Sequence, residues 1–199
     1  KKIFMIGLLA VLMLSLASCD KTKTQPSVVS AVLSEIVVEN TISTDRQYMF
    51  TNYGGEYKFY ESCVLLKDYM DEDCDGSIVG ISNVFQFADS DGEPYVVAMA
   101  HASNGKDSID IKRGFWVEDN KMNDDAIKVT YKQAFEKVMA VNLPKPHSRN
   151  AVLRNPIGPV RCNPQWVFGN VEVQIWVDAT TGEVRESNPA FPPNDENDE

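Results

Sequence analysis

Hydrophobic and polar residues alternate along this chain with two different periods, one helical and one extended. Apolar residues recur every three or four positions over residues 28–40 and again over residues 131–142, which predicts two amphipathic helices. Ser27 precedes the first and Thr130 precedes the second, and either hydroxyl can accept a hydrogen bond from the first turn of a helix. The sequence therefore predicts one helix near the start of the folded part and one past its middle.

Short runs of β-branched and aromatic residues, bounded by Gly, Asn, Asp and Pro, fill most of the remaining sequence and predict antiparallel strands joined by turns. The aromatic residues 47–51 begin this strand-rich region. The expected strands span residues 57–66, 78–88, 95–102, 109–118, 151–153, 165–168, 171–178 and 183–184. Because each predicted helix precedes a set of strands, we expect an α+β fold of two helix-plus-antiparallel-sheet units. A diverged internal repeat and a chance similarity of two β-meanders both explain this order.

The chain begins with Lys1 and Lys2, an apolar run over residues 3–14, and the tetrapeptide Leu-Ala-Ser-Cys that ends at Cys19. A basic start and an apolar run of this length are typical of a secretory signal, whereas a membrane span needs about 20 apolar residues. The tetrapeptide resembles the lipobox of bacterial lipoproteins, in which the signal is cut before the cysteine and the cysteine is acylated. We therefore expect a signal peptide over residues 1–18, lipidation of Cys19, and a place in the bacterial cell envelope, on the periplasmic side or at the cell surface.

Four further segments are expected after the signal peptide. Residues 19–27 are polar and are expected to form a flexible spacer between lipid and domain. Residues 28–122 are expected to form the first helix-plus-sheet unit and residues 123–187 the second. Residues 188–199 combine prolines with charges of one sign and are expected to be disordered.

The charge balance of the chain excludes some partners. The formal net charge is −10, from 19 Lys and Arg against 29 Asp and Glu. An acidic surface disfavours nucleic acid, whose phosphates are bound by Lys and Arg, and it disfavours adsorption to anionic lipid. We therefore expect no nucleic-acid partner, and contact with the membrane through the lipid anchor only.

Three cysteines follow Cys19, and the oxidising compartment allows them to form a disulfide. Cys63 and Cys74 are close enough in sequence to staple a local hairpin, which would leave Cys162 as a small buried residue. The alternative, with all three thiols reduced, fits the sequence equally well.

An acidic turn contains the sharpest chemical pattern. Asp71, Asp73 and Asp75 alternate and are followed by a glycine and, two residues later, an isoleucine, which matches the first eight positions of a calcium-binding loop. The bidentate glutamate that closes such a loop is replaced by Ser82. The sequence leaves two interpretations, a weak calcium site with these aspartates as ligands and a solvated acidic turn. No other cofactor is expected.

Residues suited to catalysis are few. The chain has two histidines, His101 on a predicted strand and His147 in a loop, and neither lies in a metal or nucleophile motif. No signature of a cysteine protease surrounds Cys162. We interpret the cysteine as structural and the histidines as solvated, and expect that the protein is not an enzyme.

Aromatic residues are candidates for binding, because Trp and Tyr anchor many interfaces. In β-rich folds most of them belong to the core. We expect Trp116 and Trp176 in the core and Trp166 at the surface, as an interaction anchor.

Residues 130–135, 164–168 and 176–184 resemble the PepSY and PepSY-like families, whose modules typically end in a strand reading V-D-A-x-T-G-E-V. The motif positions in this chain are Asp178, Thr181, Gly182 and Glu183. An aspartate there can cap the turn, and a glycine can adopt a positive φ.

The resemblance implies a helix packed on an antiparallel sheet, in a cystatin-like arrangement, and an extracytoplasmic module that inhibits or regulates proteases. We therefore expect a non-enzymatic protein-interaction module that binds an envelope protein or protease through its edge strands or the loop at 155–164. The alternative is a calcium-dependent module that binds a small molecule, glycan or peptide.

Overall fold

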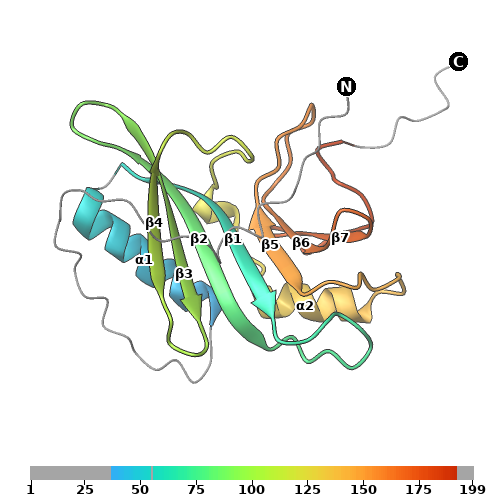
Figure 1. Cartoon of the computed structure of the whole chain (residues 1–199). Helices are drawn as coiled ribbons and strands as arrows, with labels where there is room; N and C mark the ends of the chain where they lie inside the picture. The colour runs from blue at the N-terminus through green and yellow to red at the C-terminus, as the bar shows by residue number, and fades with distance from the viewer. Residues whose placement is uncertain (1–36, 55, 192–199) are drawn as a thin grey trace, which may run out of the picture.

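The computed structural model describes residues 37–54 and 56–191, which form an antiparallel sheet with two α-helices (Figure 1). The helices are α1 (Val38–Tyr53), the short 3-10 helix η2 (Asp124–Ala126) and α2 (Tyr131–Ala140). The strands are β1 (Lys58–Leu66), β2 (Ile78–Ala88), β3 (Pro94–Ala102), β4 (Ser108–Arg113), β5 (Asn150–Arg154), β6 (Gln165–Gly169), β7 (Gln174–Asp178) and β8 (Val184–Arg185). No helix in these ranges is long and apolar enough to cross a membrane. The fold class is α+β, as the sequence predicts.

All eight strands belong to one sheet with the order β4-β3-β2-β1-β5-β6-β7-β8, and every neighbouring pair is antiparallel. Strands β1 to β4 form one meander and strands β5 to β8 form another. The first strands of the two meanders pair with each other, from Glu61 opposite Arg154 to Leu65 opposite Asn150. The sheet is therefore continuous across the boundary that the sequence suggests at residues 122 and 123.

Both helices cover the same face of the sheet. Val64 of β1 lies opposite Ala151 of β5 and Ile81 of β2, and all three are buried in the main core. Met49 of α1 and Phe135 of α2 are buried in the same cluster. Because side chains alternate between the two faces of a strand, the residues between these core positions point to the opposite face.

A smaller set of buried apolar residues lies outside the main core. Its members are Tyr60, Val84, Val167, Trp176 and Ala190. Val84 precedes the core residue Phe85, and Val167 lies between two core residues of β6 and opposite Trp176, so these strand residues face away from the helices. The second face of the sheet is thus also partly covered.

The last described residues belong to the fold. The side chain of Ala190 has no exposed surface, and its carbonyl accepts the N–H of Val160 at 3.3 Å. A Cβ at Gly158 would lie 2.5 Å from the Cβ of Ala190, so the backbone approaches closely there. Disorder expected over residues 188–199 is therefore wrong for residues 188–191, because a small residue within this polar stretch packs against a glycine. Residues 192–199 lie outside the described part.

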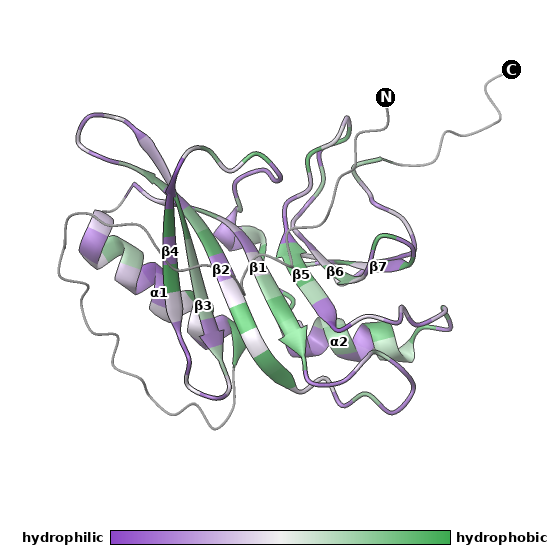
Figure 2. Cartoon of the chain, viewed as in Figure 1, coloured by the Kyte–Doolittle hydropathy of each residue, from purple (hydrophilic) through white to green (hydrophobic). Residues whose placement is uncertain are grey.

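Helix α1 differs most from the expectation. It begins at Val38, so most of the helix expected over residues 28–40 lies outside the described residues. The strand character expected for residues 47–51 is wrong, because these residues are helical and Met49 is fully buried. Buried residues recur every three or four positions along α1. Figure 2 shows that hydrophilic and hydrophobic residues both occur along this helix. Packing against the sheet thus outweighs the β-propensity of the aromatic residues.

Helix α2 begins where the sequence predicts. The side chain of Thr130 accepts the N–H of Gln133 at 3.2 Å, and the side chain of Gln133 accepts the N–H of Thr130 at 2.9 Å. At the other end, the ammonium of Lys145 donates to the carbonyls of Val138 and Val141 at 2.7 and 2.6 Å. Side chains therefore satisfy backbone groups that the ends of a helix leave free.

The strands lie close to their expected positions, except that β4 ends at Arg113 rather than at residue 118. Residues 114–122 leave the sheet at this point, and we call them the crossing segment. The turns and loop over residues 155–164 connect β5 to β6, and we call them the proline loop. These two irregular segments carry exposed apolar side chains, and the crossing segment also carries the buried carboxylate of Asp119.

Candidate functional site

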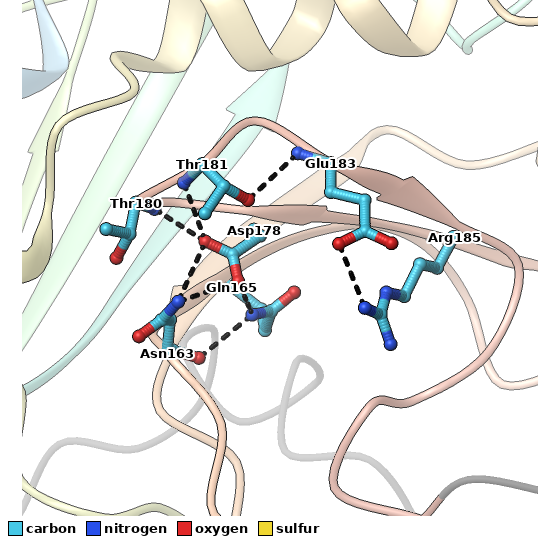
Figure 3. A network of polar contacts seen from close by, with 7 residues as sticks. All are labelled: Asn163, Gln165, Asp178, Thr180, Thr181, Glu183 and Arg185. Atoms are coloured by element: carbon cyan, nitrogen blue, oxygen red, sulfur yellow. Dashed lines mark hydrogen bonds and ion pairs between the residues drawn. The ribbon is translucent and has the colours of Figure 1, made fainter.

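The residues that resemble the PepSY motif come together in the turn between β7 and β8 (Figure 3). Asp178 ends β7, and one of its carboxylate oxygens accepts the backbone N–H groups of Thr180 and Thr181, both at 2.8 Å. The other oxygen accepts the side-chain amides of Asn163 at 3.0 Å and Gln165 at 3.4 Å. A single carboxylate thus closes the turn and ties the preceding loop to it.

The remaining motif positions complete the same turn. Gly182 has φ 76°, and its N–H donates to the carbonyl of Asp178 at 2.8 Å. The hydroxyl of Thr181 accepts the N–H of Glu183 at 3.3 Å, and Glu183 pairs with exposed Arg185 at 2.9 Å. The motif therefore needs an acceptor at its first position and a residue that tolerates positive φ at position 182. These contacts give the motif a role in closing the fold.

The carboxylate of Asp178 is stabilised in its charged form. Burial acts to raise the pKa of Asp178, but hydrogen bonds from Thr181, Asn163 and Thr180 outweigh it and the pKa is lowered. We predict that Asp178→Ala lowers the free energy of unfolding by about 1–2 kcal/mol at neutral pH, because two amide groups lose their acceptor. Since the folded pKa is depressed, this contribution is present above the ordinary aspartate pKa and is lost as pH falls through the folded value.

Urea unfolding at neutral and acidic pH measures this contribution. The control is Asp125→Ala, which removes an exposed carboxylate near the start of η2. Equal losses for the two variants at neutral pH would contradict the prediction for Asp178.

The three aspartates of the predicted calcium loop are exposed. The carboxylate of Asp71 accepts the N–H of Asp73 at 3.1 Å, and that of Asp75 accepts the N–H of Ser77 at 2.8 Å. Within residues 37–54 and 56–191, no group of three or more His, Cys, Asp and Glu side chains is arranged to hold a metal ion. The structure does not bring the three carboxylates together, and calcium binding stays a prediction.

The three cysteines of the described residues are free. The disulfide expected between Cys63 and Cys74 is therefore not formed in the structure. Cys63 lies in β1 between Ser62 and Val64, so its side chain points away from the helices. Cys74 packs against the main core on the helix side of the sheet. Closeness in sequence was misleading because the two side chains lie on opposite sides of the sheet.

The expectation for Trp166 is wrong, because its side chain is 1% exposed. Its Nε1 donates to the carbonyl of Val129 at 2.9 Å, and its ring meets that of Tyr131 edge to face at 5.7 Å. Trp176 is buried as expected, although on the face away from the helices. Trp116 is only half-buried, because it lies in the crossing segment and outside the core.

His101 is not solvated, contrary to the sequence interpretation. Its Nε2 lies 2.9 Å from a carboxylate oxygen of Asp45 in α1, and its Nδ1 lies 3.4 Å from Asp107. Asn83 of β2 donates to the other Asp45 oxygen at 2.7 Å. The hydrogen bond with Asp45 is the main cause that raises the pKa of His101. The network ties α1 to the sheet, whereas His147 is exposed as expected.

A cluster of ionisable side chains on the face away from the helices was not foreseen. Glu61 of β1 lies directly opposite Arg154 of β5. The Nε of Arg154 donates to an oxygen of Asp119 at 2.6 Å, and the side chain of Asp119 has no exposed surface. The indole N–H of Trp116 lies 3.4 Å from the second oxygen. The guanidinium of Arg154 thus pairs with Asp119 and lies across from the carboxyl group of Glu61. These three residues could be brought together only by knowing the strand register.

The carboxyl groups of this cluster are not both charged at neutral pH. Burial, and then the charge of Asp119, raise the pKa of Glu61 to about 8, and Arg154 offsets this only in part. Because one guanidinium faces two carboxyl groups in a buried site, the protonated form of Glu61 is favoured near neutral pH. Burial, with a further contribution from Glu61, raises the pKa of neighbouring Cys63 to about 12. That thiol is therefore protonated and unreactive near neutral pH.

The crossing segment and the proline loop lie against each other. Asp119 forms a bridge with Pro156, and the N–H of Asn120 donates to the carbonyl of Asn155 at 2.7 Å. The side chain of Asn155 in turn donates to the carbonyl of Lys121 at 3.0 Å. Four large apolar side chains on these two segments are exposed, and we call them the loop-end residues: Phe115, Val117, Ile157 and Val160.

Comparison with known proteins adds no relative. The chain matches no family model, no curated protein and no solved structure. The resemblance to PepSY-like families stays a prediction.

Proposed function

We propose that the protein is a non-enzymatic interaction module, anchored to the membrane of the bacterial cell envelope through Cys19, that binds and restrains an envelope protein or protease. The exposure of the loop-end residues supports this proposal most directly. Phe115 is 68% exposed and Val117 is 74% exposed, and both lie on a segment that is hydrogen-bonded to the proline loop. Large exposed apolar side chains on segments that are held in place are typical of surfaces that bind other proteins.

The contacts between the crossing segment and the proline loop favour binding because they hold the loop-end residues in place. The bridge between Asp119 and Pro156 and the hydrogen bonds of Asn120 and Asn155 restrain both segments before any partner arrives. A restrained loop loses less conformational entropy on binding than a free one, so more of the contact energy appears as affinity. This is the property that an inhibitor of a protease requires.

The order of elements supports a finer hypothesis about the fold. One helix precedes a four-stranded meander twice, as α1 with β1 to β4 and as α2 with β5 to β8. The two meanders meet through their first strands. We propose that they are diverged copies of one cystatin-like, PepSY-like unit, which agrees with the regulation of proteases that the resemblance implies.

Paired substitutions test the binding surface. We predict that the double variant Phe115→Ser, Val117→Ser weakens binding of the envelope partner about tenfold or more, because anchoring aromatic residues dominate interface energies. The matched control is Val171→Ser, Val173→Ser, at the turn between β6 and β7, where Val171 is 97% exposed. The partner is first identified by crosslinking in the protein's own cells, and its affinity and proteolytic activity are then measured with each purified variant.

Two results would contradict the proposal. One is an unchanged affinity for the Phe115 and Val117 variant, and the other is an equal loss for the control. Thermal melts of both variants accompany the assay, because exposed side chains contribute little to stability and both melting temperatures should stay near that of the wild type.

A further inference from the structure

The crossing segment is bound to the sheet at both ends and in its middle. At one end, the N–H of Trp116 donates to the side-chain carbonyl of Gln86 in β2 at 3.0 Å. At the other end, the N–H of Met122 donates to the carbonyl of Phe59 in β1 at 2.8 Å. In the middle, Asp119 makes the contact through its ion pair with β5. The middle contact is the one that contains titratable groups.

We propose that Glu61, Asp119 and Arg154 form a proton-dependent latch, which holds the crossing segment against the sheet while Glu61 is protonated and releases it when that proton is lost. The loop-end residues Phe115 and Val117 belong to the same segment. The latch would therefore regulate the binding surface, a consequence that rests on the proposed function.

The charges around Asp119 explain why the proton matters. The ionisable groups around the Glu61 and Asp119 pair are Arg154 on β5, Glu118 on the crossing segment, and Cys63, which lies near Glu61 on β1. The Cys63 thiol stays neutral, and the neighbouring strand β2 contains no ionisable side chain. A single guanidinium can compensate one buried carboxylate, so a second ionisation leaves a negative charge without a partner.

Opening of the crossing segment removes the cost of this uncompensated charge. Asp119 lies on the segment, whereas Glu61 and Arg154 lie on the sheet, so release separates the two carboxyl groups and leaves one Glu–Arg pair behind. Water can then solvate the carboxylate of Asp119. The backbone carbonyl of Glu118, which accepts from Arg154 at 3.2 Å, would leave with it.

The direction of the pH effect follows from Glu61. Its folded pKa of about 8 is raised above the ordinary value of 4.5. A carboxyl group with a raised pKa favours the closed state in its protonated form, so its contribution is full below the ordinary value and is lost as pH rises through the folded value. The latch is therefore closed in mild acid and opens in mild alkali.

Amide hydrogen exchange of the full chain tests the latch without any partner. The reporters are the N–H groups of Trp116, Asn120 and Met122, each donated to another segment or strand. We expect their protection, corrected for intrinsic exchange, to fall about tenfold between about pH 5.5 and about pH 8.5. In the variant Glu61→Gln, whose side chain cannot ionise, the protection should be the same at both pH values. The control Glu172→Gln, exposed at the turn between β6 and β7, should behave like the wild type.

Equal protection of the wild type at both pH values would overturn the latch, and so would an equal fall in Glu61→Gln. If Glu61→Gln does not fold, a carbon-13 titration of the wild-type carboxyl groups replaces it. A Glu61–Asp119 pair that loses its last proton near the ordinary glutamate pKa would overturn the proposal, and one that retains it above about pH 6 would support it. Failure of the Phe115 and Val117 binding assay would remove the proposed function and leave these results intact.

Discussion

Replacing Trp166 with Ala is expected to lower the free energy of unfolding by about 4 kcal/mol, within the range found for large aromatic residues in cores. The side chain is 1% exposed, packs edge to face against Tyr131, and donates to the carbonyl of Val129. The substitution leaves a cavity under α2 and a buried carbonyl without its donor. Chemical denaturation measures the loss.

The comparison with Phe115→Ala makes this result specific. Phe115 is a large aromatic residue on the crossing segment and is mostly exposed, so its removal should cost less than about 0.5 kcal/mol. Similar losses for the two variants would mean that Trp166 is not the core residue that the structure shows.

Replacing Arg154 with Met is expected to lower the free energy of unfolding by about 3 kcal/mol near neutral pH, at the lower end of the range for a broken buried ion pair. The side chain of Arg154 is 30% exposed, whereas that of its partner Asp119 is fully buried. Methionine keeps much of the volume but leaves Asp119 and Glu61 without a cation. The loss should be smaller in mild acid than above about pH 8, because Glu61, whose pKa is raised to about 8, then holds a proton and fewer negative charges lack a cation.

An exposed ion pair offers the matched control for this variant. Arg185 pairs with Glu183 at 2.9 Å, and both side chains are about half exposed. Arg185→Met should change stability by less than about 0.5 kcal/mol, with little dependence on pH. A loss for Arg154→Met that matches this control, or one that grows in mild acid, would contradict the account of the cluster.

Local signals in the sequence predicted the strands and the second helix because those elements are decided by near neighbours. The hydroxyl of Thr130 and the side chain of Gln133 form their capping box within one turn. The β-branched and aromatic runs bounded by turn residues likewise correspond to β1, β2, β3 and β6. The shortening of β4 could not be predicted in this way, since residues 115–117 are as apolar as a strand and yet Phe115 and Val117 are exposed on the crossing segment.

Features that depend on tertiary packing could not be predicted from the sequence. Residues 47–51 include two aromatic residues, which favour strands, but the segment is helical because its Met49 packs into the core. The sequence does not show which residues of β1 face the helices, because both faces of this strand carry apolar residues. It therefore could not show that Cys63 faces away from the core and from Cys74. Propensity is a weak guide where packing on a sheet decides the outcome.

The candidate sites also differ in whether their contacts are local in the sequence or depend on tertiary packing. The motif around Asp178 was visible because its contacts lie within a few residues of one another, apart from those to the end of the proline loop. Glu61, Asp119 and Arg154 come from three distant segments and meet only through the register of β1 with β5 and the path of the crossing segment. Nothing in the local sequence of any of them indicates that they share a site.

A photo-crosslinking residue placed at position 115 tests the central claim most directly, with position 171 as its matched control. Both positions carry exposed apolar side chains, but they lie on different segments of the molecule. In its own cells, the lipid-anchored protein is predicted to crosslink one dominant envelope protein from position 115, and to give no such product from position 171. No crosslinked protein above background from position 115, or the same product from both positions, would contradict the account.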